Sequence, residues 1–243
     1  MHRFMLTGMS GGEFWLTGDE LRHLAVVRLG PGDTVIGFDG EGSYRGVITE
    51  VGAERAVCRI EAALPGTGEA AARIYLVMGL AKGEKIEWVI QKGTELGMSG
   101  FIPLVTARSI VRPDESRRAA REARRRKIAA EAAKQCGRIR PPAIWPVAAW
   151  AELPALLPPD TAYILAWEEE KERSFRAELA QTDWGRPLAL LIGPEGGFTP
   201  AEAGFAAREL KAAPVSLGER VLRSETAALA VLALALGAAG DLG

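Results

Sequence analysis

From Arg73 onward, short apolar runs alternate with segments of helical periodicity, and this alternation restricts the fold more than any other feature of the chain. The apolar runs are IYLVMG, FIPLV, AYILAW, LALLIG and PVSL. Helices are predicted near residues 84–96, 116–136, 174–180, 200–211 and 225–236. Nearly continuous apolar strands separated by helices indicate an α/β fold whose parallel sheet is covered on both faces. Such sheets bind ligands beyond the carboxyl ends of their strands.

The N-terminal part follows a different pattern, with short strands separated by Gly, Asp and Pro from Phe4 to about Leu64. Only residues 19–29 look helical, so a small β-barrel with one helix is predicted. The boundary is predicted in PGTGEAA, which gives domains of residues 1–70 and 71–243. GTGEAA also fits a dinucleotide fingerprint, but a strand follows it where the fingerprint needs a helix, so a linker is favoured.

Composition excludes several classes of protein. Formal net charge is −1 over 243 residues, so any affinity for nucleic acid has to come from local patches. Two cysteines and two histidines are too few for a thiolate or imidazole metal cluster, and we expect no metal and no disulfide framework. We expect a cytoplasmic protein without a signal peptide or membrane span, because the apolar run from Ala227 is shorter than the roughly 20 residues a span requires. That run predicts a helix in the core, in a dimer interface, or in both.

The stretch LLIGPEGGFTPAE predicts a buried strand, a short loop and a helix. Thr199 is a good N-cap, Pro200 suits the first helical position, and Glu202 completes a capping box. Glycines in the loop permit positive φ and let a ligand lie against the backbone. A tight turn without a ligand is the alternative, and Glu195 could serve only to stabilise the loop.

A second loop, in VSLGERVLRSETAAL, follows the next predicted strand. It holds a glycine turn and two arginines, and Ser224 is the predicted N-cap of the terminal helix. Two consecutive loops of this kind leave a parallel sheet at the same end. Together they predict the walls of a pocket.

GPEGGFTPAE followed by LGERVLRSETAAL resembles the RsmE family of 16S ribosomal RNA methyltransferases, which form 3-methyluridine. RHLAVVR, KGEKIEWVIQKGTELGM, ARSIV and KIAAEAAKQCGR agree, so the resemblance covers essentially the whole chain. It implies the SPOUT fold, an α/β sheet with a trefoil knot, preceded by a PUA-like β-barrel for RNA. It also implies a homodimer and S-adenosylmethionine as the cofactor.

The resemblance places the cofactor in three loops, around Ala166, from Ile192 to Gly197 and from Leu217 to Arg223. The residues implied to bind it are Ala166, Ile192, Gly193, Gly196, Leu217, Gly218, Val221 and Leu222. Adenine would bond backbone groups exposed at the glycines, and the apolar side chains would pack against its faces. The acidic sequence EEEKERSF after Trp167 leaves the contacts of the first loop the least defined.

The implied reaction transfers a methyl group to N3 of a uridine without a metal. N3 has to lose a proton, and the negative charge then spread over the flanking carbonyl oxygens needs stabilisation. Arg223 is the predicted catalytic residue and Arg220 the second candidate. The alternative for Arg223 is a structural ion pair with Glu225 or Glu195.

The segment RRAAREARRRKIAAEAAKQCGRIR is a basic helix with two interpretations. One is phosphate binding, for which Arg124, Arg125 and Arg126 are candidates; the other is a solvated face paired with Glu115, Glu122 and Glu131. In the barrel, the RNA-binding candidates are Arg3, Arg28 and Arg45, whereas His23 is expected to be a packing residue.

The leading hypothesis is methylation of a specific uridine in 16S ribosomal RNA within the assembled small ribosomal subunit. Two alternatives are a SPOUT methyltransferase acting on another RNA or base, and an inactive RNA-binding or ribosome-assembly factor. The intact GPEGG and LRSETA motifs count against the inactive factor.

Overall fold

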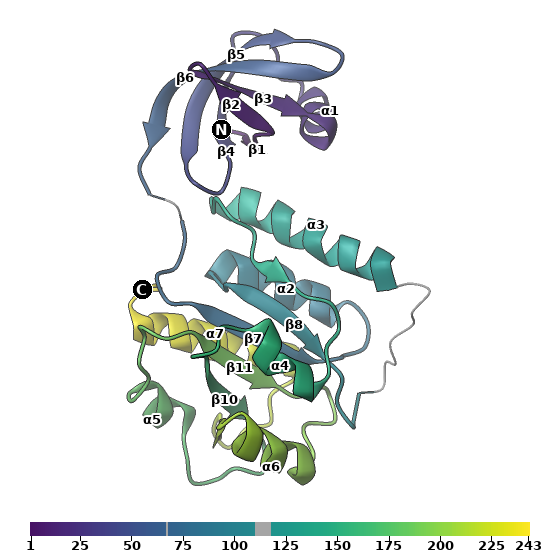
Figure 1. The fold of residues 1–243 in the computed structure, drawn as a ribbon, viewed down its shortest axis with the longest axis vertical. Coiled ribbons are helices and arrows are strands. Elements are labelled where there is room, and N and C mark those ends of the chain that lie inside the picture. Colours follow the sequence, from purple (N-terminus) through teal and green to yellow (C-terminus); the bar gives the residue numbers. More distant parts are fainter. Residues whose placement is uncertain (67, 110–117) are drawn as a thin grey trace. The chain divides into compact units, whose positions relative to one another are not determined.

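A computed structural model describes residues 1–66, 68–109 and 118–243, which fall into two compact units (Figure 1). The first unit holds Met1–Glu69 together with Ala133–Pro141, and the second holds Ala70–Ala132 together with Pro142–Gly243. Arg117, the first residue of the basic segment, and Glu115, one of its predicted partners, lie outside the described residues. None of the helices in the described ranges has the length and hydropathy needed to cross a bilayer.

The first unit is a curled, six-stranded sheet with one short helix, α1 (Gly18–Val26). The strand order is β1-β4-β5-β6-β3-β2. The strands are β1 (Arg3–Met5), β2 (Gly8–Ser10), β3 (Glu13–Thr17), β4 (Thr34–Phe38), β5 (Ser43–Val51) and β6 (Arg55–Leu64). All pairs are antiparallel except β1 with β4. β3 to β6 confirm the predicted strands, while β1 and β2, of three residues each, were not predicted.

The curl of this sheet has a local cause in the pairing of β5 with β6. Its register shifts at Arg45/Gly46 and again at Ile48/Glu50, and such irregularities bend a strand and increase its twist. The core of this unit packs around Phe14, which is fully buried. A Cβ at Gly37 or Gly46 would lie under 3.0 Å from the Phe14 ring, so these glycines make room for it.

The second unit is built on a six-stranded sheet of order β12-β10-β11-β7-β8-β9, in which every pair is parallel. The strands are β7 (Ile74–Gly79), β8 (Gly100–Leu104), β9 (Ala143–Ile144), β10 (Ala162–Ala166), β11 (Leu188–Ile192) and β12 (Ala213–Val215). The predicted parallel sheet is therefore confirmed.

Helices cover both faces of this sheet because alternate residues of each strand point to opposite sides. Leu76, Leu190 and Ile192 face a core completed by α2 (Lys85–Leu96), α5 (Phe175–Leu179) and α7 (Ser224–Ala239). Val77 and Leu191 face the other core, completed by α4 (Leu153–Leu156) and α6 (Pro200–Glu209).

Two features of the helices differ from the predictions. Arg223, rather than Ser224, is the N-cap of α7, and the Ser224 hydroxyl bonds to Glu225 instead of to a backbone N–H. The segment around residues 150–156, for which nothing was predicted, forms η2 (Trp150–Glu152) and α4. α3 (Arg118–Cys136) is the basic helix.

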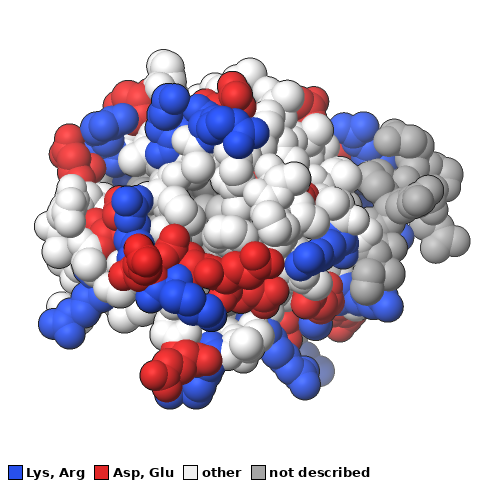
Figure 2. Space-filling model, turned by 90° about the horizontal axis from the view of Figure 1, so that it is seen from below, with Lys and Arg blue, Asp and Glu red and all other residues white. Residues whose placement is uncertain are grey.

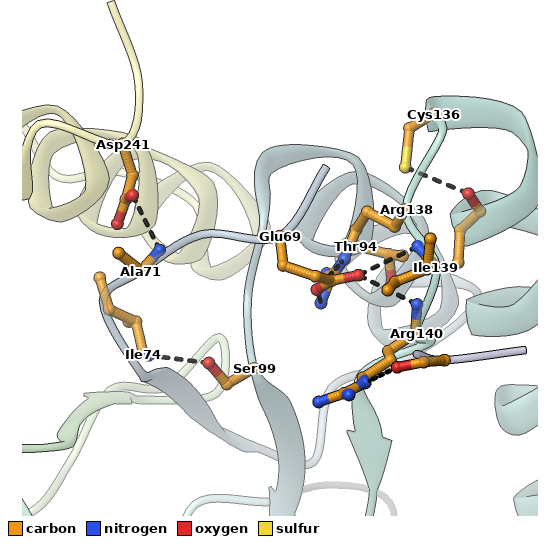
Figure 3. A network of polar contacts seen from close by, with 12 residues as sticks. Glu69, Ala71, Ile74, Thr94, Ser99, Cys136, Arg138, Ile139, Arg140 and Asp241 are labelled. Carbon is orange, nitrogen blue, oxygen red and sulfur yellow. Dashed lines mark hydrogen bonds and ion pairs between the residues drawn. The ribbon is translucent and has the colours of Figure 1, made fainter. Parts of the chain in front are cut away.

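Carboxylates hold the chain on each side of the unit boundary (Figure 3). In the first unit, Glu69 accepts hydrogen bonds from the Arg138 side chain and from the backbone N–H groups of Ile139 and Arg140. In the second unit, Asp241 accepts from the backbone N–H groups of Ala71 and Ala72, both at 2.8 Å. Asp241 thus ties the last residues of the chain to the segment that leads into β7.

Asp241→Ala tests this tie. The substitution leaves two backbone donors without their acceptor, and we expect the free energy of unfolding to fall by about 1–3 kcal/mol. Asp160→Ala is the control, because the Asp160 side chain is exposed and has no hydrogen bond or ion pair to the described residues. Urea unfolding of both variants measures the difference, and an equal loss in both would contradict the role of Asp241.

Candidate functional site

Three loops leave the second sheet at the same edge and surround a cavity of about 340 Å³. Ala166 pairs in register with both Ile192 and Val215, so β10, β11 and β12 end at nearly the same level. The cavity is lined by residues from the loop after each strand and by Lys85 of α2. Its volume lies in the roughly 300–1,000 Å³ range typical of small-molecule sites.

The structure brings nearly all of the predicted cofactor and catalytic residues to this cavity. Those that line it are Ala166, Ile192, Gly193, Leu217, Gly218, Arg220, Val221, Leu222 and Arg223. Gly196 does not line it, because its carbonyl points to Arg108 and accepts a hydrogen bond of 2.7 Å from Nη1. Arg108 comes from the ARSIV motif, so two motifs far apart in sequence meet at this loop.

The glycines of the GPEGGF loop act differently from the prediction. Positive φ occurs at Gly197 (68°) but not at Gly193 or Gly196. A Cβ on Gly193 would lie 3.0 Å from the backbone of Gly197, so Gly193 permits the tight closure of the loop on itself. The loop is therefore a compact turn that also lines a cavity.

The capping box that ends this loop is confirmed. The Thr199 hydroxyl accepts from the backbone N–H of Glu202, and the Glu202 carboxylate accepts from the backbone N–H of Thr199. Glu202 also accepts from the N–H of Ala107 and from the indole of Trp150. Burial alone would raise the pKa of Glu202, but these hydrogen bonds outweigh it and hold the pKa below its ordinary value.

Lys85 joins the GPEGGF loop to the first turn of α7 through one carboxylate on each. Its Nζ lies 2.9 Å from Glu195 and 3.4 Å from Glu225, and Glu195 also accepts from the backbone N–H of Lys82. Burial acts to raise the pKa of each carboxyl group, yet the hydrogen bonds and the charge of Lys85 hold the pKa of both below the ordinary value. The hydrogen bond to Glu195 is the largest cause of the raised pKa of Lys85.

Lys85 pairs with both Glu195 and Glu225, and the alternative ion pair of Arg223 with either carboxylate does not form. Within the described part of the chain, neither Arg223 nor Arg220 has an ion pair or a side-chain hydrogen bond, and both side chains are exposed at the cavity. Arg223 precedes α7 as its N-cap, which fixes the backbone from which the side chain extends. Two guanidinium groups are therefore free to act on a bound ligand.

Four charged residues of the cavity were not predicted to lie there: Lys85, Glu168, Lys171 and Glu219. Lys85 is the first residue of α2, the helix that follows β7. The other loops were recognised because they follow the carboxyl end of a strand, and the same signal could have identified Lys85. Glu168 belongs to the acidic loop after β10, and its Oε1 would lie 2.9 Å from a Cβ on Gly197. The Glu168 position had no local signal, because it depends on how two loops pack.

The three RNA-binding candidates of the first unit differ in their exposure and in their side-chain partners. Arg3 is half-buried and donates to the carbonyl of Gly137, so its contacts lie inside the first unit. Arg45 is exposed and 3.6 Å from Glu61, while Arg28 is exposed and has no partner among the described residues. His23 packs against the ring of Phe4 at 5.3 Å, as expected of a packing residue.

The three arginines predicted together on the basic helix have different environments. Arg124 pairs with Glu84 and Arg126 with Glu122, so both belong to a solvated, partly paired face. Arg125 is only 6% exposed, so it does not belong to that solvated face. Figure 2 shows a face on which Lys and Arg are interspersed with Asp and Glu, in line with the net charge of −1.

Comparisons with known proteins agree over nearly the whole chain. A family model described as an RNA methyltransferase domain matches residues 68–236, and one described as an RNA methyltransferase PUA domain matches residues 16–61. Ribosomal RNA small subunit methyltransferase E of Bacillus subtilis is 34% identical over 225 residues, which are 90% of this chain and 88% of that protein. The protein of the same name from Mycobacterium bovis is 32% identical, over 93% of this chain and 85% of its own.

A solved structure of that enzyme has the same architecture. The crystal structure of ribosomal RNA small subunit methyltransferase E from Neisseria gonorrhoeae, bound to S-adenosyl methionine, superposes with a TM-score of 0.83. It is 29% identical to this chain, and the match covers 96% of this chain and 95% of that one.

Lys85→Met tests the link between the loops. The lowered pKa of Glu195 and Glu225 means that their pairing stabilises the fold above their ordinary pKa of 4.5 and that this is lost as pH falls through the folded-state pKa. We expect Lys85→Met to be roughly 1 kcal/mol less stable than the wild type at neutral pH. This difference should shrink when unfolding is measured at about pH 3.5.

Lys82→Met is the matched control, because the Lys82 side chain is exposed and its contact with Glu195 uses the backbone. It should stay close to the wild type at both pH values. A pH-independent loss in Lys85→Met would show that the lysine acts by packing alone.

Proposed function

Because this chain belongs to the RNA methyltransferase family, we propose that it transfers a methyl group from S-adenosylmethionine to N3 of a specific uridine in 16S ribosomal RNA. The observation that carries the proposal is the cavity at the carboxyl edge of the sheet. There the GPEGG and LGERVLRSETA motifs meet, with two arginines free of ion pairs to the described residues. The relatives named ribosomal RNA small subunit methyltransferase E support the small-subunit RNA as substrate.

The residues of the cavity fit S-adenosylmethionine, which supplies a methyl group on a positively charged sulfur. Leu217, Val221 and Leu222 offer apolar surface for an adenine ring. Glu168 brings a carboxylate with no side-chain partner among the described residues, which suits a cationic ligand. We infer that the three loops around this cavity also form the trefoil knot of the SPOUT superfamily.

Arg223 is the residue we assign to charge stabilisation, with Arg220 as the second. When N3 of the uracil loses its proton, negative charge spreads over O2 and O4, and a guanidinium beside the ring stabilises it. Lys85 supports this by holding Glu195 and Glu225, which would otherwise attract Arg223 away from the ligand. Glu195 is a poor base because its pKa is low and its carboxylate is already paired.

The first unit is assigned to RNA binding, in agreement with the match of residues 16–61 to a PUA domain. Arg28 is the best-placed candidate there, because it is exposed and has no partner in the described ranges. Arg45 can also reach RNA after leaving Glu61, a pair that is weak because it is solvated. Recognition of an assembled small subunit would combine this unit with the second.

We also infer that the protein is a cytoplasmic homodimer. α7 is apolar on most of its surface, yet Leu234 on it is 58% exposed, and Trp88 of the neighbouring α2 is 45% exposed. Exposed large apolar side chains on two adjacent helices favour a protein interface. Light scattering should give twice the chain mass, and a Leu234→Glu variant should give the mass of one chain.

Arg223→Ala tests the catalytic assignment. Loss of an electrostatic group that acts on developing charge should lower turnover about a hundredfold or more while cofactor binding remains measurable. Arg176→Ala on α5 is the control, since Arg176 is exposed and does not line the cavity. Wild-type turnover in Arg223→Ala would transfer the role to Arg220 or remove it from this loop.

Nucleoside mass spectrometry tests the function as a whole. Unmodified 16S RNA and small ribosomal subunits are each incubated with the protein and S-adenosylmethionine. New 3-methyluridine establishes the reaction, and a higher yield on subunits establishes recognition of assembled structure. A methyl group on another base would favour a different RNA methyltransferase, and cofactor binding without any methylation would favour an inactive assembly factor.

A further inference from the structure

A second cavity, of about 460 Å³, lies beyond the carboxyl ends of β7 and β8. It is enclosed by the loop between β7 and α2, the first turns of α3 and the segment around residues 147–152. The first turn of α2 serves both cavities, because Lys85 lines the first and Glu87 lines the second. The second cavity has no role in the chemistry described above.

The most unusual residue of this cavity is Arg125. Its side chain lines the cavity although the residue is only 6% exposed, and its buried Nε has no hydrogen-bond partner among the described residues. A buried N–H group without a partner is costly, because its hydration is lost and no hydrogen bond replaces it. Burial is the main cause of its lowered pKa, while the charge of Glu87 opposes the shift.

A second free guanidinium lies one turn earlier on the same helix. Arg121 lines the cavity, is half-buried, and has no ion pair within the described ranges. The carboxylate of Glu122 is already engaged by Arg118 and Arg126. Arg121 and Arg125 are therefore the cations available to a ligand, and a phosphate is the group that such paired planar donors bind best.

The remaining walls suit the rest of a nucleotide. Apolar residues line much of the cavity, namely Leu80, Ile86, Val105, Val147 and Ala148. A base packs well against such surfaces, and Glu87 can accept a hydrogen bond from an N–H on its edge. A purely apolar ligand would leave both arginines unsatisfied, whereas a bare anion would leave the apolar walls empty.

We propose that this cavity binds one nucleotide of the RNA substrate other than the one that is methylated. Its phosphate lies on Arg121 and Arg125, and its base packs against the apolar lining that includes Ile86 and Val147. The proposal rests on the proposed function, because it takes RNA as the substrate. A nucleotide held here lies beside the first turn of α2 and therefore close to the methylation site. It would orient the RNA strand for the reaction.

The test uses the full chain and unmodified 16S RNA made by transcription. Arg121→Ala and Arg125→Met should each weaken RNA binding about tenfold and reduce the slope of log affinity against log salt by about one. Affinity for S-adenosylmethionine should stay at the wild-type value, because the first cavity is unchanged. The control is Lys127→Ala, which removes a charge from the exposed side of the same helix and should have less than about a twofold effect.

Wild-type RNA affinity in either arginine variant would overturn the proposal. If Arg125→Met also loses affinity for the cofactor, that variant is misfolded, and the RNA affinity of Arg121→Ala alone then tests the proposal. Photocrosslinking of 16S RNA that contains 4-thiouridine gives a direct readout, because the crosslinked peptide should contain Ile86 or Val147. A failure of the proposed function would be recognised separately, because the wild-type protein would then form no 3-methyluridine. The comparison of RNA affinity between the wild type and the arginine variants would still test this cavity.

Discussion

Parallel pairing in register is the constraint on which the second unit depends. Ala166, Ile192 and Val215 lie at one level, and Met78 pairs with Ile192 in the same row. Because parallel strands all run the same way, the segments that follow them leave at one edge, where four separate parts of the chain come together. The first cavity is built from these segments, and the second lies at the same edge beyond β7 and β8, so the position of each site follows from the sheet.

Charge pairing then decides which side chains at this edge remain available. Lys85 lies between Glu195 and Glu225 and pairs with both, so these carboxylates tie the GPEGGF loop to the start of α7 instead of capturing an arginine. Arg223 and Arg220 are left free of pairs to the described residues. Glu202 acts similarly on a smaller scale, since it caps α6 and also binds the segment at Ala107. A few carboxylates thus hold the loops, and the arginines are left for ligands.

α3 shows that a basic segment does not have one function. Arg124 and Arg126 pair with carboxylates at the surface, as expected of a solvated helix face. Arg125, between them in sequence, points into a cavity and lacks a partner for its Nε in the described part of the chain. Successive residues of a helix are about 100° apart, so neighbours in the sequence meet different surroundings. Charge density along the sequence therefore says little about which arginine binds a ligand.

The sequence by itself determined the features that depend on nearby residues. Apolar runs between helices predicted the parallel sheet, Thr199 and Glu202 predicted the capping box, and the loop motifs predicted which residues line the first cavity. Only the tertiary structure placed Lys85 between two carboxylates, Glu168 beside Gly197, and Arg125 inside a second cavity. Local signals suffice where a helix cap or a strand period involves a few consecutive residues. Contacts between residues far apart in the sequence depend on how the loops pack once the sheet has formed, and no spacing in the sequence encodes that packing directly.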